Sequence, residues 1–385
     1  MMNTKTLYQD LMALCENSES FHFKDFRLDD QVYRIFNYRL ASWTEFEKPN
    51  AKNCRGAMFN ITDLNAPRIV SLPMEKFFNY EEGNVDHTKA KMIFKMEKLD
   101  GSLISTYLHK DEVRLKSKAS LFSEQAVAAM AFLNKPENAA YKEAVTILAQ
   151  CEFTVNFEYT APTNRVVVPY QTENLTIISI RDNVTGWDYY GDDEPQELLD
   201  CFNIKGISPE NMVKYSVVEC YDQLKYVDEL RQEEVGEGYV IALQLPDGER
   251  YRVKVKNHKY LTLHSAKDGA QNPKRLCEAV IDEVTDDLRS LFADDPYILG
   301  VIKDMEDRVI PVYNHMINQV EHFYESMKDV DRKTYAIAAK SAYPQYMGLL
   351  MNLYLGQPND YKEFAKKNMK ELFGVVAKPN FVAED

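Results

Sequence analysis

The sequence predicts an α+β domain over residues 1–268, followed by an all-helical domain over residues 270–385. Before about residue 270 the chain contains short runs rich in Tyr, Phe, Ile and Val, separated by Asn, Gly and Pro, which is typical of mixed or antiparallel sheets. After that point apolar residues recur at helical spacing and almost nothing alternates. A chain of 385 residues is long enough for two domains.

The first domain should begin with a helix over residues 4–16, because Leu7, Leu11 and Leu14 share one helical face. Sheet-forming runs follow from residue 32 to about 104. A hairpin is expected over 104–118 and a helical segment over 123–150. The remaining expected strands are 153–159, 166–170, 175–180, 238–245 and 251–255.

The second domain should consist of helices over 277–293, 299–329, 332–342, 345–355 and 359–373. Pro311 lies inside the longest of these segments. Because proline lacks an amide hydrogen and its ring clashes with the preceding turn, we expect Pro311 to kink or split this helix.

Composition limits the classes of protein that need to be considered. The N-terminus lacks the apolar core of a signal peptide, and no window approaches the ~18 apolar residues of a membrane span, so no membrane partner is expected. The six cysteines form no C-x-x-C pair, which argues against zinc and favours reduced thiols. The net charge of −14 disfavours nucleic acid, but basic residues cluster near 89–98, 114–118 and 250–259.

Lys98-Leu99-Asp100-Gly101 is the first segment whose residues could take part in catalysis. Asp-Gly between alternating residues is a strong hairpin signal, so a plain turn explains it when it is taken alone. The same pattern, Lys-x-Asp-Gly, is the nucleophile motif of covalent nucleotidyltransferases. There the lysine amine attacks the α-phosphorus of a nucleotide and expels pyrophosphate.

Three further elements follow in order: Phe157-Glu158-Tyr159, Glu237-Gly238-Tyr239-Val240 and Lys254-Val255-Lys256. Side chains two apart on a strand share a face, so both ammonium groups of the last element can point at one triphosphate. Each element also has an ordinary explanation, either a turn or a solvated strand face. Four elements in sequence, each beside apolar strand residues, favour the chemical interpretation.

These four elements resemble motifs I, III, IV and V of the superfamily that contains DNA ligases, RNA ligases and capping enzymes. Further stretches resemble the RNA ligase 1 family of T-even-type bacteriophages over nearly the full length. They are Cys54-Arg55-Gly56, the segments 73–79, 117–120, 123–126 and 161–165, and Asp331–Ala336 in the helical part. The resemblance implies a nucleotidyltransferase (adenylyltransferase) domain followed by a helical domain that helps select RNA or tRNA.

The resemblance also implies roles for matching residues. Lys98 would carry AMP, and Lys118, Glu237 and Tyr260 would be needed for catalysis. Phe78 would be a further active-site residue. The residues expected to bind ATP are Tyr38, Arg55, Lys76, Asp100, Gly101, Glu158, Lys254 and Lys256.

ATP and Mg²⁺ are the implied cofactors, with Mn²⁺ as a substitute, because ATP arrives with a metal held by hard oxygen ligands. Glu237 and the pair Asp286-Asp287 are the candidate metal ligands. The pair has an equally good alternative interpretation: Thr285 could cap a helix whose dipole the two carboxylates oppose.

The resemblance implies an ATP-dependent RNA ligase that repairs tRNA cut in the anticodon loop, in the cytoplasm of an infected bacterium. A polynucleotide kinase/phosphatase would prepare the RNA ends. Two alternatives stay open: a DNA ligase or capping enzyme, although these carry a β-barrel after motif V, and a catalytically silent RNA-binding protein. Retention of Lys98, Lys254 and Lys256 counts against the second alternative.

Overall fold

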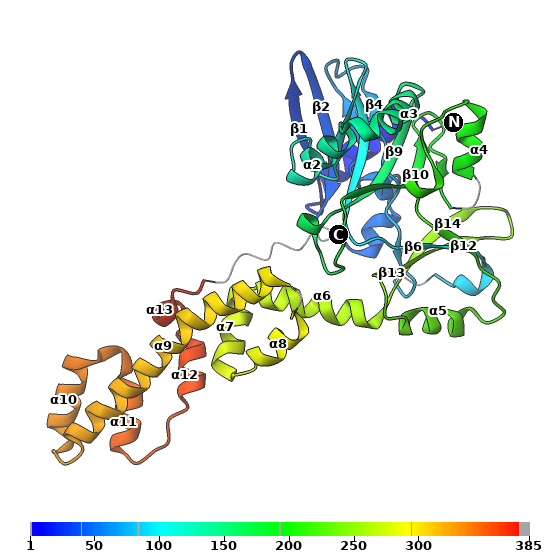
Figure 1. Ribbon diagram of the computed structural model, residues 1–385. Helices are drawn as coiled ribbons and strands as arrows, with labels where there is room; N and C mark the ends of the chain where they lie inside the picture. The colour runs from blue at the N-terminus through cyan, green and yellow to red at the C-terminus, as the bar shows by residue number, and fades with distance from the viewer. Residues whose placement is uncertain (1, 40, 83–84, 192–193, 294, 377–385) are drawn as a thin grey trace. The chain divides into compact units, whose positions relative to one another are not determined.

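The structure, a computed structural model, describes residues 2–39, 41–82, 85–191, 194–293 and 295–376. The chain divides into two compact units, Met1–Leu261 and Thr262–Asp385. The first unit mixes sheets with helices and the second is helical, which confirms the predicted fold class (Figure 1).

Three sheets build the first unit. The first has the order β1-β2-β3-β4, the second β11-β10-β9-β7-β8 and the third β12-β6-β13-β14-β5. The strands of the first sheet are β1 (Phe21–Leu28), β2 (Gln31–Tyr38), β3 (Met58–Asn60) and β4 (Arg68–Ser71). Those of the second are β7 (Ser102–His109), β8 (Glu112–Ser117), β9 (Phe153–Thr160), β10 (Asn174–Asp182) and β11 (Asp188–Tyr189). Those of the third are β5 (Phe78–Asn79), β6 (Lys91–Glu97), β12 (Tyr215–Val217), β13 (Gly238–Gln244) and β14 (Arg250–Lys256).

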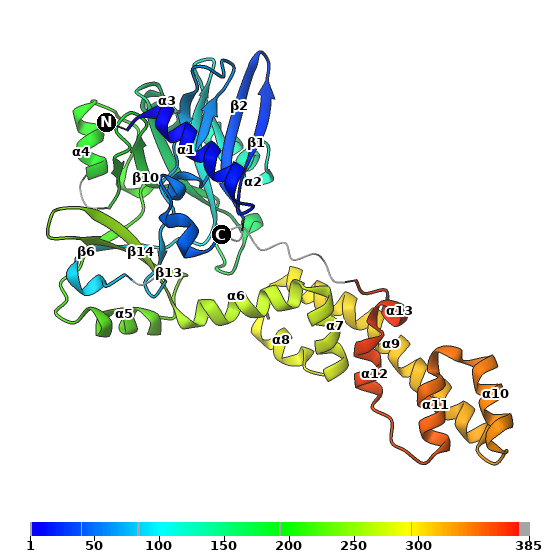
Figure 2. The same ribbon diagram turned by 180° about the vertical axis from the view of Figure 1, so that it is seen from behind.

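Helices cover these sheets where their apolar side chains meet. They are α1 (Thr4–Asn17), α2 (Glu124–Leu133), α3 (Ala139–Gln150), α4 (Glu194–Cys201) and α5 (Gln223–Gln232). Helices α2 and α3 pack on the second sheet, whereas α1 packs beside β1 and is seen from the other side of the unit (Figures 1 and 2). Helix α5 packs on one face of β14 through Val227 and Leu230, which meet Val253 and Val255. The alternate side chains of β14 are therefore left for the opposite face.

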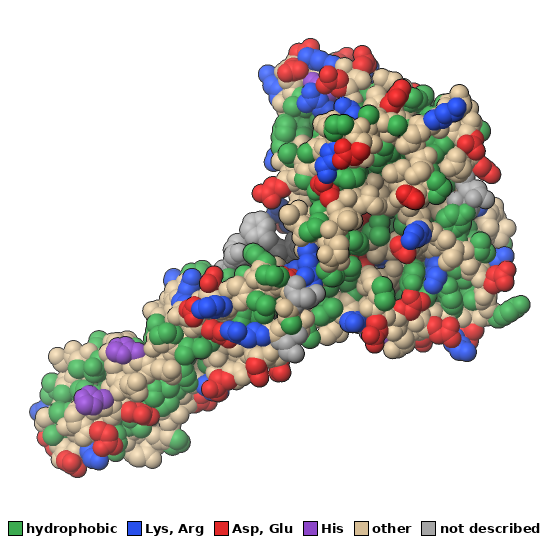
Figure 3. All heavy atoms as spheres, viewed as in Figure 1, with side chains coloured by type: hydrophobic (Ala, Val, Ile, Leu, Met, Phe, Trp, Pro, Cys, Tyr) green, Lys and Arg blue, Asp and Glu red, His purple; other side chains and the backbone are tan. Residues whose placement is uncertain are grey.

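Helix α6 (His258–Gln271) begins in the first unit and continues into the helical unit. It therefore starts before the predicted helical region, which began at residue 270. The remaining helices are α7 (Pro273–Asp282), α8 (Thr285–Leu291), α9 (Pro296–Met327), α10 (Arg332–Ala342), α11 (Met347–Tyr354), α12 (Tyr361–Lys367) and α13 (Met369–Phe373). Acidic and basic side chains are interspersed over the face of this unit seen in Figure 3. Among the described residues, no helix is both long and apolar enough to cross a membrane.

Pro311 does not split the long helix, because α9 is one helix that contains it, so of the two predicted outcomes only the kink stays a prediction. Pro311 is exposed, so water can satisfy the carbonyl that it frees, while Val309 and Met316 hold the buried face. The predicted strand over residues 166–170 is a loop instead, because its backbone bonds to a buried carboxylate rather than to a neighbouring strand.

Candidate active site

Lys98 lies on the segment that joins β6, in the third sheet, to β7, in the second sheet. Its Nζ donates a hydrogen bond to Glu237 Oε2 at 2.7 Å, and the other oxygen of Glu237 lies 3.0 Å from Lys256 Nζ. Glu237 is only 2% exposed. One buried carboxylate therefore binds both the predicted nucleophile and one of the predicted phosphate-binding lysines.

Asp100 fixes the turn that follows Lys98. One oxygen of its buried carboxylate accepts hydrogen bonds from the amides of Val167 and Val168, each at 2.7 Å, and the other accepts one from Tyr260 Oη at 2.7 Å. The amide of Asp100 donates to Tyr170 Oη. Asp100 and Tyr260 therefore position the nucleophile segment, and a direct contact between Asp100 and ATP stays a prediction.

Gly101 is required where the turn meets β9. Its amide donates to Glu158 Oε1 at 2.9 Å, and a Cβ atom added there would lie 2.3 Å from the carbonyl oxygen of Tyr159. Burial raises the pKa of Glu158 to about 7, the Lys98 charge opposes this shift, and Glu237 adds to it. Glu158 can therefore change protonation state near neutral pH.

Lys254 shares its strand face with Lys256, as predicted from their spacing. Burial lowers the pKa of Lys254 well below its ordinary value, and the charges of Lys98, Lys76, Arg55 and Lys256 lower it further. These cations come from separate segments and crowd one region. An anion with several charges, such as a triphosphate, would relieve their mutual repulsion.

Tyr38 forms the aromatic side of this region. Lys76 Nζ lies 5.2 Å and Lys118 Nζ 5.1 Å from its ring centroid, and Lys76 lies 5.6 Å from the Phe78 ring. Burial raises the pKa of Tyr38, but Lys76, Arg55 and Lys118 outweigh burial and leave the pKa lowered. The first sheet thus contributes the Tyr38 ring, and Lys76 and Lys118 reach this ring from segments outside that sheet.

Sequence reasoning missed Lys116, which is fully buried on β8. Its Nζ donates to the Gly56 carbonyl at 2.7 Å, and burial together with Arg55 lowers its pKa to about 7. Gly56 has φ +96°, and a Cβ atom there would approach the Lys118 carbonyl at 2.9 Å. Lys116 therefore supports the loop that carries Arg55. Its two-residue spacing from Lys118 was the only sequence signal, and that spacing alone would not indicate burial.

Asp286 and Asp287 belong to the helical unit, whereas the other predicted site residues belong to the first unit. Both are exposed in the first turn of α8. Thr285 does not cap this helix, because it is the first helical residue and its hydroxyl donates to Glu306 instead. Within the described ranges, no three His, Cys, Asp or Glu side chains converge as metal ligands. Both oxygens of Glu237 contact lysines, so a metal ion would have to displace one of these lysines, and the assignment of Glu237, Asp286 and Asp287 as metal ligands stays a prediction.

A lysine bound to a carboxylate, beside several cations and an aromatic ring at the junction of mixed sheets, is the arrangement expected of a nucleotidyltransferase. The chain belongs to the RNA ligase family, whose model matches residues 53–260. A second model, described as the C-terminal domain of T4 RNA ligase 1, matches residues 267–380. The resemblance found in the sequence is thereby confirmed.

Relatives from viruses and a bacterium agree with this family. An RNA ligase of Rhodothermus phage RM378 is 24% identical over 76% of each chain. A protein of Autographa californica nuclear polyhedrosis virus, described as a bifunctional polynucleotide kinase/RNA ligase, is 27% identical over 73% of this chain and 41% of its own length. A Thermovibrio ammonificans protein, described as an RNA ligase, is 30% identical over 49% of this chain and 48% of its own length. The chain thus spans less than half of the last two relatives.

Proposed function

We propose that this protein is an ATP-dependent RNA ligase that joins 5′-phosphate and 3′-hydroxyl RNA ends through lysyl-AMP and RNA-adenylate intermediates. The observation that carries the proposal is the bridge from Lys98 through Glu237 to Lys256, set among Arg55, Lys76 and Lys254. Such a bridge holds an amine beside a region that attracts phosphates.

In the first step Lys98 Nζ forms a bond to the α-phosphorus of ATP and the bond to pyrophosphate breaks. The amine must first lose a proton. Glu237, at 2.7 Å, favours the ammonium form, whereas the surrounding cations favour the neutral amine. The charges of Lys254, Lys76 and Arg55 are available to balance the pyrophosphate as it leaves.

In the second step the RNA 5′-phosphate takes AMP from Lys98, and in the third a 3′-hydroxyl displaces AMP and the strands are joined. The first unit holds all the residues proposed for nucleotide chemistry, so we assign these steps to it. We assign RNA selection to the helical unit, which matches the C-terminal domain model. ATP phosphates would supply most ligands of the Mg²⁺ or Mn²⁺ that accompanies them.

The natural substrate that we propose is tRNA cut in the anticodon loop, in the cytoplasm of an infected bacterium. A polynucleotide kinase/phosphatase would prepare its ends. This last proposal is supported by the viral relative whose description combines a polynucleotide kinase with an RNA ligase. The phage origin of another relative supports the setting.

Incubation with α-labelled ATP and Mg²⁺, followed by a denaturing gel, tests the proposal. Wild type should acquire an acid-labile label and Lys98→Ala should acquire none. Wild type should then seal 5′-phosphorylated RNA and leave 5′-hydroxyl RNA unjoined. Normal labelling of Lys98→Ala would show that the nucleophile is misassigned. Sealing of nicked DNA in preference to RNA would favour a DNA ligase.

A further inference from the structure

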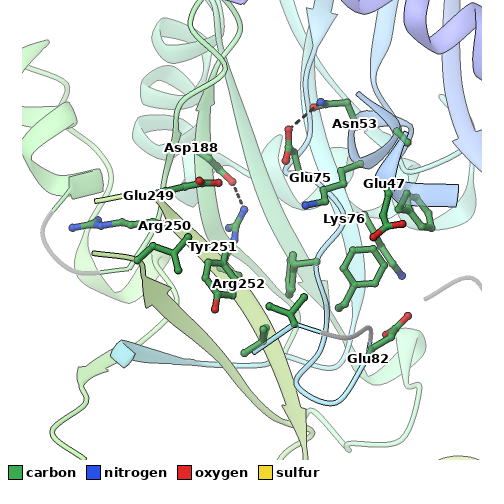
Figure 4. Close-up of a pocket in the computed structure, with 18 of the residues that line it drawn as sticks. Glu47, Asn53, Glu75, Lys76, Glu82, Asp188, Glu249, Arg250, Tyr251 and Arg252 are labelled. Carbon is green, nitrogen blue, oxygen red and sulfur yellow. Dashed lines mark hydrogen bonds and ion pairs between the residues drawn. The ribbon is translucent and has the colours of Figure 1, made fainter. Parts of the chain in front are cut away.

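A cavity of about 880 Å³ lies beside the active site (Figure 4). Lys76 and Phe78, already placed at the site, also line this cavity. Lys76 extends into it from one wall, and Arg252 and Tyr251 lie on the other. The volume is in the range of pockets that hold small-molecule ligands, so the cavity has room for part of a nucleotide chain.

Strand β14 runs from the active site to the cavity. Arg250, Arg252, Lys254 and Lys256 occupy alternate positions and therefore share one face. Lys256 lies at the end of the strand near Lys98, because both lysines contact Glu237. Arg252 and Arg250, nearer the other end, line the cavity. Successive members of this row are separated by roughly 6.6 Å along the strand. The row therefore leads away from the nucleophile and into the cavity.

Aromatic side chains form much of the cavity wall. Trp43 packs edge-on against Phe78 with centroids 4.3 Å apart, and Tyr251 and Trp187 are also among the lining residues. The Tyr251 ring stacks on His87 and its hydroxyl contacts His87 Nδ1, whereas Trp187 is 49% exposed. Rings beside cations are the usual means of holding single-stranded nucleic acid, because bases stack on the rings while phosphates meet the charges.

The geometry of displacement at phosphorus indicates which strand would lie there. Attacking and leaving groups are roughly in line, so pyrophosphate departs from the side opposite Lys98. In the next step Lys98 is the leaving group, and the RNA 5′-phosphate must enter from the side that pyrophosphate vacated. The nucleotide that carries this phosphate then lies farther from Lys98 than Lys254 does, in the direction of Arg252.

We propose that this cavity binds the first nucleotides of the 5′-phosphorylated RNA strand, with Trp187 as a stacking residue. The inference rests on the proposed ligase function and adds a substrate site to it. Several cavity cations are already matched by carboxylates, since Arg252 pairs with Asp188 and Arg250 with Glu194. Binding should therefore depend more on stacking than on net charge, with a shallow dependence on salt.

The test is Trp187→Ala in the full chain. Enzyme charged with AMP is mixed with a 5′-phosphorylated oligoribonucleotide whose 3′ end is blocked, and transfer of AMP is followed. The KM for this strand should rise roughly 5- to 150-fold, the loss expected for one stacked base. Self-adenylylation should not change, and Trp187→Phe should retain most of the affinity. Tyr221→Ala, which removes a fully exposed ring that does not line the cavity, is the matched control.

Binding of a 5′-phosphorylated trinucleotide to the uncharged protein gives a second measurement that needs no catalysis. Wild type should bind it more tightly than Trp187→Ala does, and the 5′-hydroxyl trinucleotide should bind less tightly than the phosphorylated one. The inference is overturned if Trp187→Ala leaves both the KM and this binding unchanged. It is also overturned if the variant slows self-adenylylation equally, or if only the KM of the 3′-hydroxyl strand rises. A wild type that binds the trinucleotide but never acquires label would refute the ligase proposal and leave the site standing.

Discussion

Replacing Lys116 by Met removes an ammonium group that the fold buries completely. Nζ donates to the carbonyl of Gly56 at 2.7 Å and lies 3.4 Å from that of Ser117. Burial is the larger cause and the charge of Arg55 the smaller one; together they lower the pKa of Lys116 from an ordinary 10.5 to about 7. Methionine has a similar length but neither takes up a proton nor donates a hydrogen bond.

The sign of the effect follows from proton linkage. Between pH 7 and pH 10 the unfolded chain holds a proton on Lys116 more often than the folded chain does, so wild type gains stability as pH rises. Integrated between pH 7 and pH 10, the two pKa values give a gain of roughly 3–4 kcal/mol. Lys116→Met lacks this gain. It also leaves the Gly56 carbonyl without its donor, a cost of about 1–3 kcal/mol that changes little with pH.

Thermal melting of wild type and Lys116→Met at pH 7, 8, 9 and 10 measures the difference. At pH 10 the variant should melt well below wild type, and near pH 7 the gap should close or reverse. For a unit of this size roughly 3–4 kcal/mol corresponds to a change in the Tm gap of roughly 6–16 °C. Lys205→Met, at an exposed position, should show a constant gap. A gap that is equally constant for Lys116→Met would refute the burial argument.

Three further predictions concern the site. Because burial and neighbouring cations lower the pKa of Lys254, ATP binding at alkaline pH should return a proton to this lysine. Calorimetry in buffers of different ionisation enthalpy should show the proton uptake, and Lys254→Arg should reduce the uptake. Equal uptake by both proteins would contradict the assignment. Gly101→Ala should lower self-adenylylation by at least ~100-fold, because its Cβ atom meets the Tyr159 carbonyl and displaces the turn beside the nucleophile; normal labelling would show that the turn has room. The double variant Asp286→Asn, Asp287→Asn should keep the wild-type Mg²⁺ dependence of labelling and lose at most ~1–2 kcal/mol of stability, since both carboxylates are exposed in a first helical turn. A shifted Mg²⁺ dependence would instead assign them to the metal.

Local features could be predicted from the sequence because their causes are local. Helix α1 follows from the spacing of its leucines, and the hairpins β7–β8 and β13–β14 follow from alternation around turn residues. The shared face of Lys254 and Lys256 needs only the period of a strand. The order of the four motifs indicated the superfamily, and further stretches such as Cys54-Arg55-Gly56 narrowed it to the RNA ligase family before any distance was known.

Only the tertiary structure decided how these pieces meet. Lys98 and Glu237 are 139 residues apart, and their contact exists because antiparallel β6 and β13 are neighbours in one sheet. The loop over 166–170 has strand-like residues, yet Asp100, far away in sequence, binds its amides and removes them from any ladder. Lys116 appears in the sequence as an ordinary surface lysine of a strand, and it is buried because the Gly56 loop packs over it. The sequence by itself determined the family and predicts which residues carry the chemistry. Long-range packing decided their partners, their burial and their protonation, because desolvation and charge depend on neighbours that no local pattern specifies.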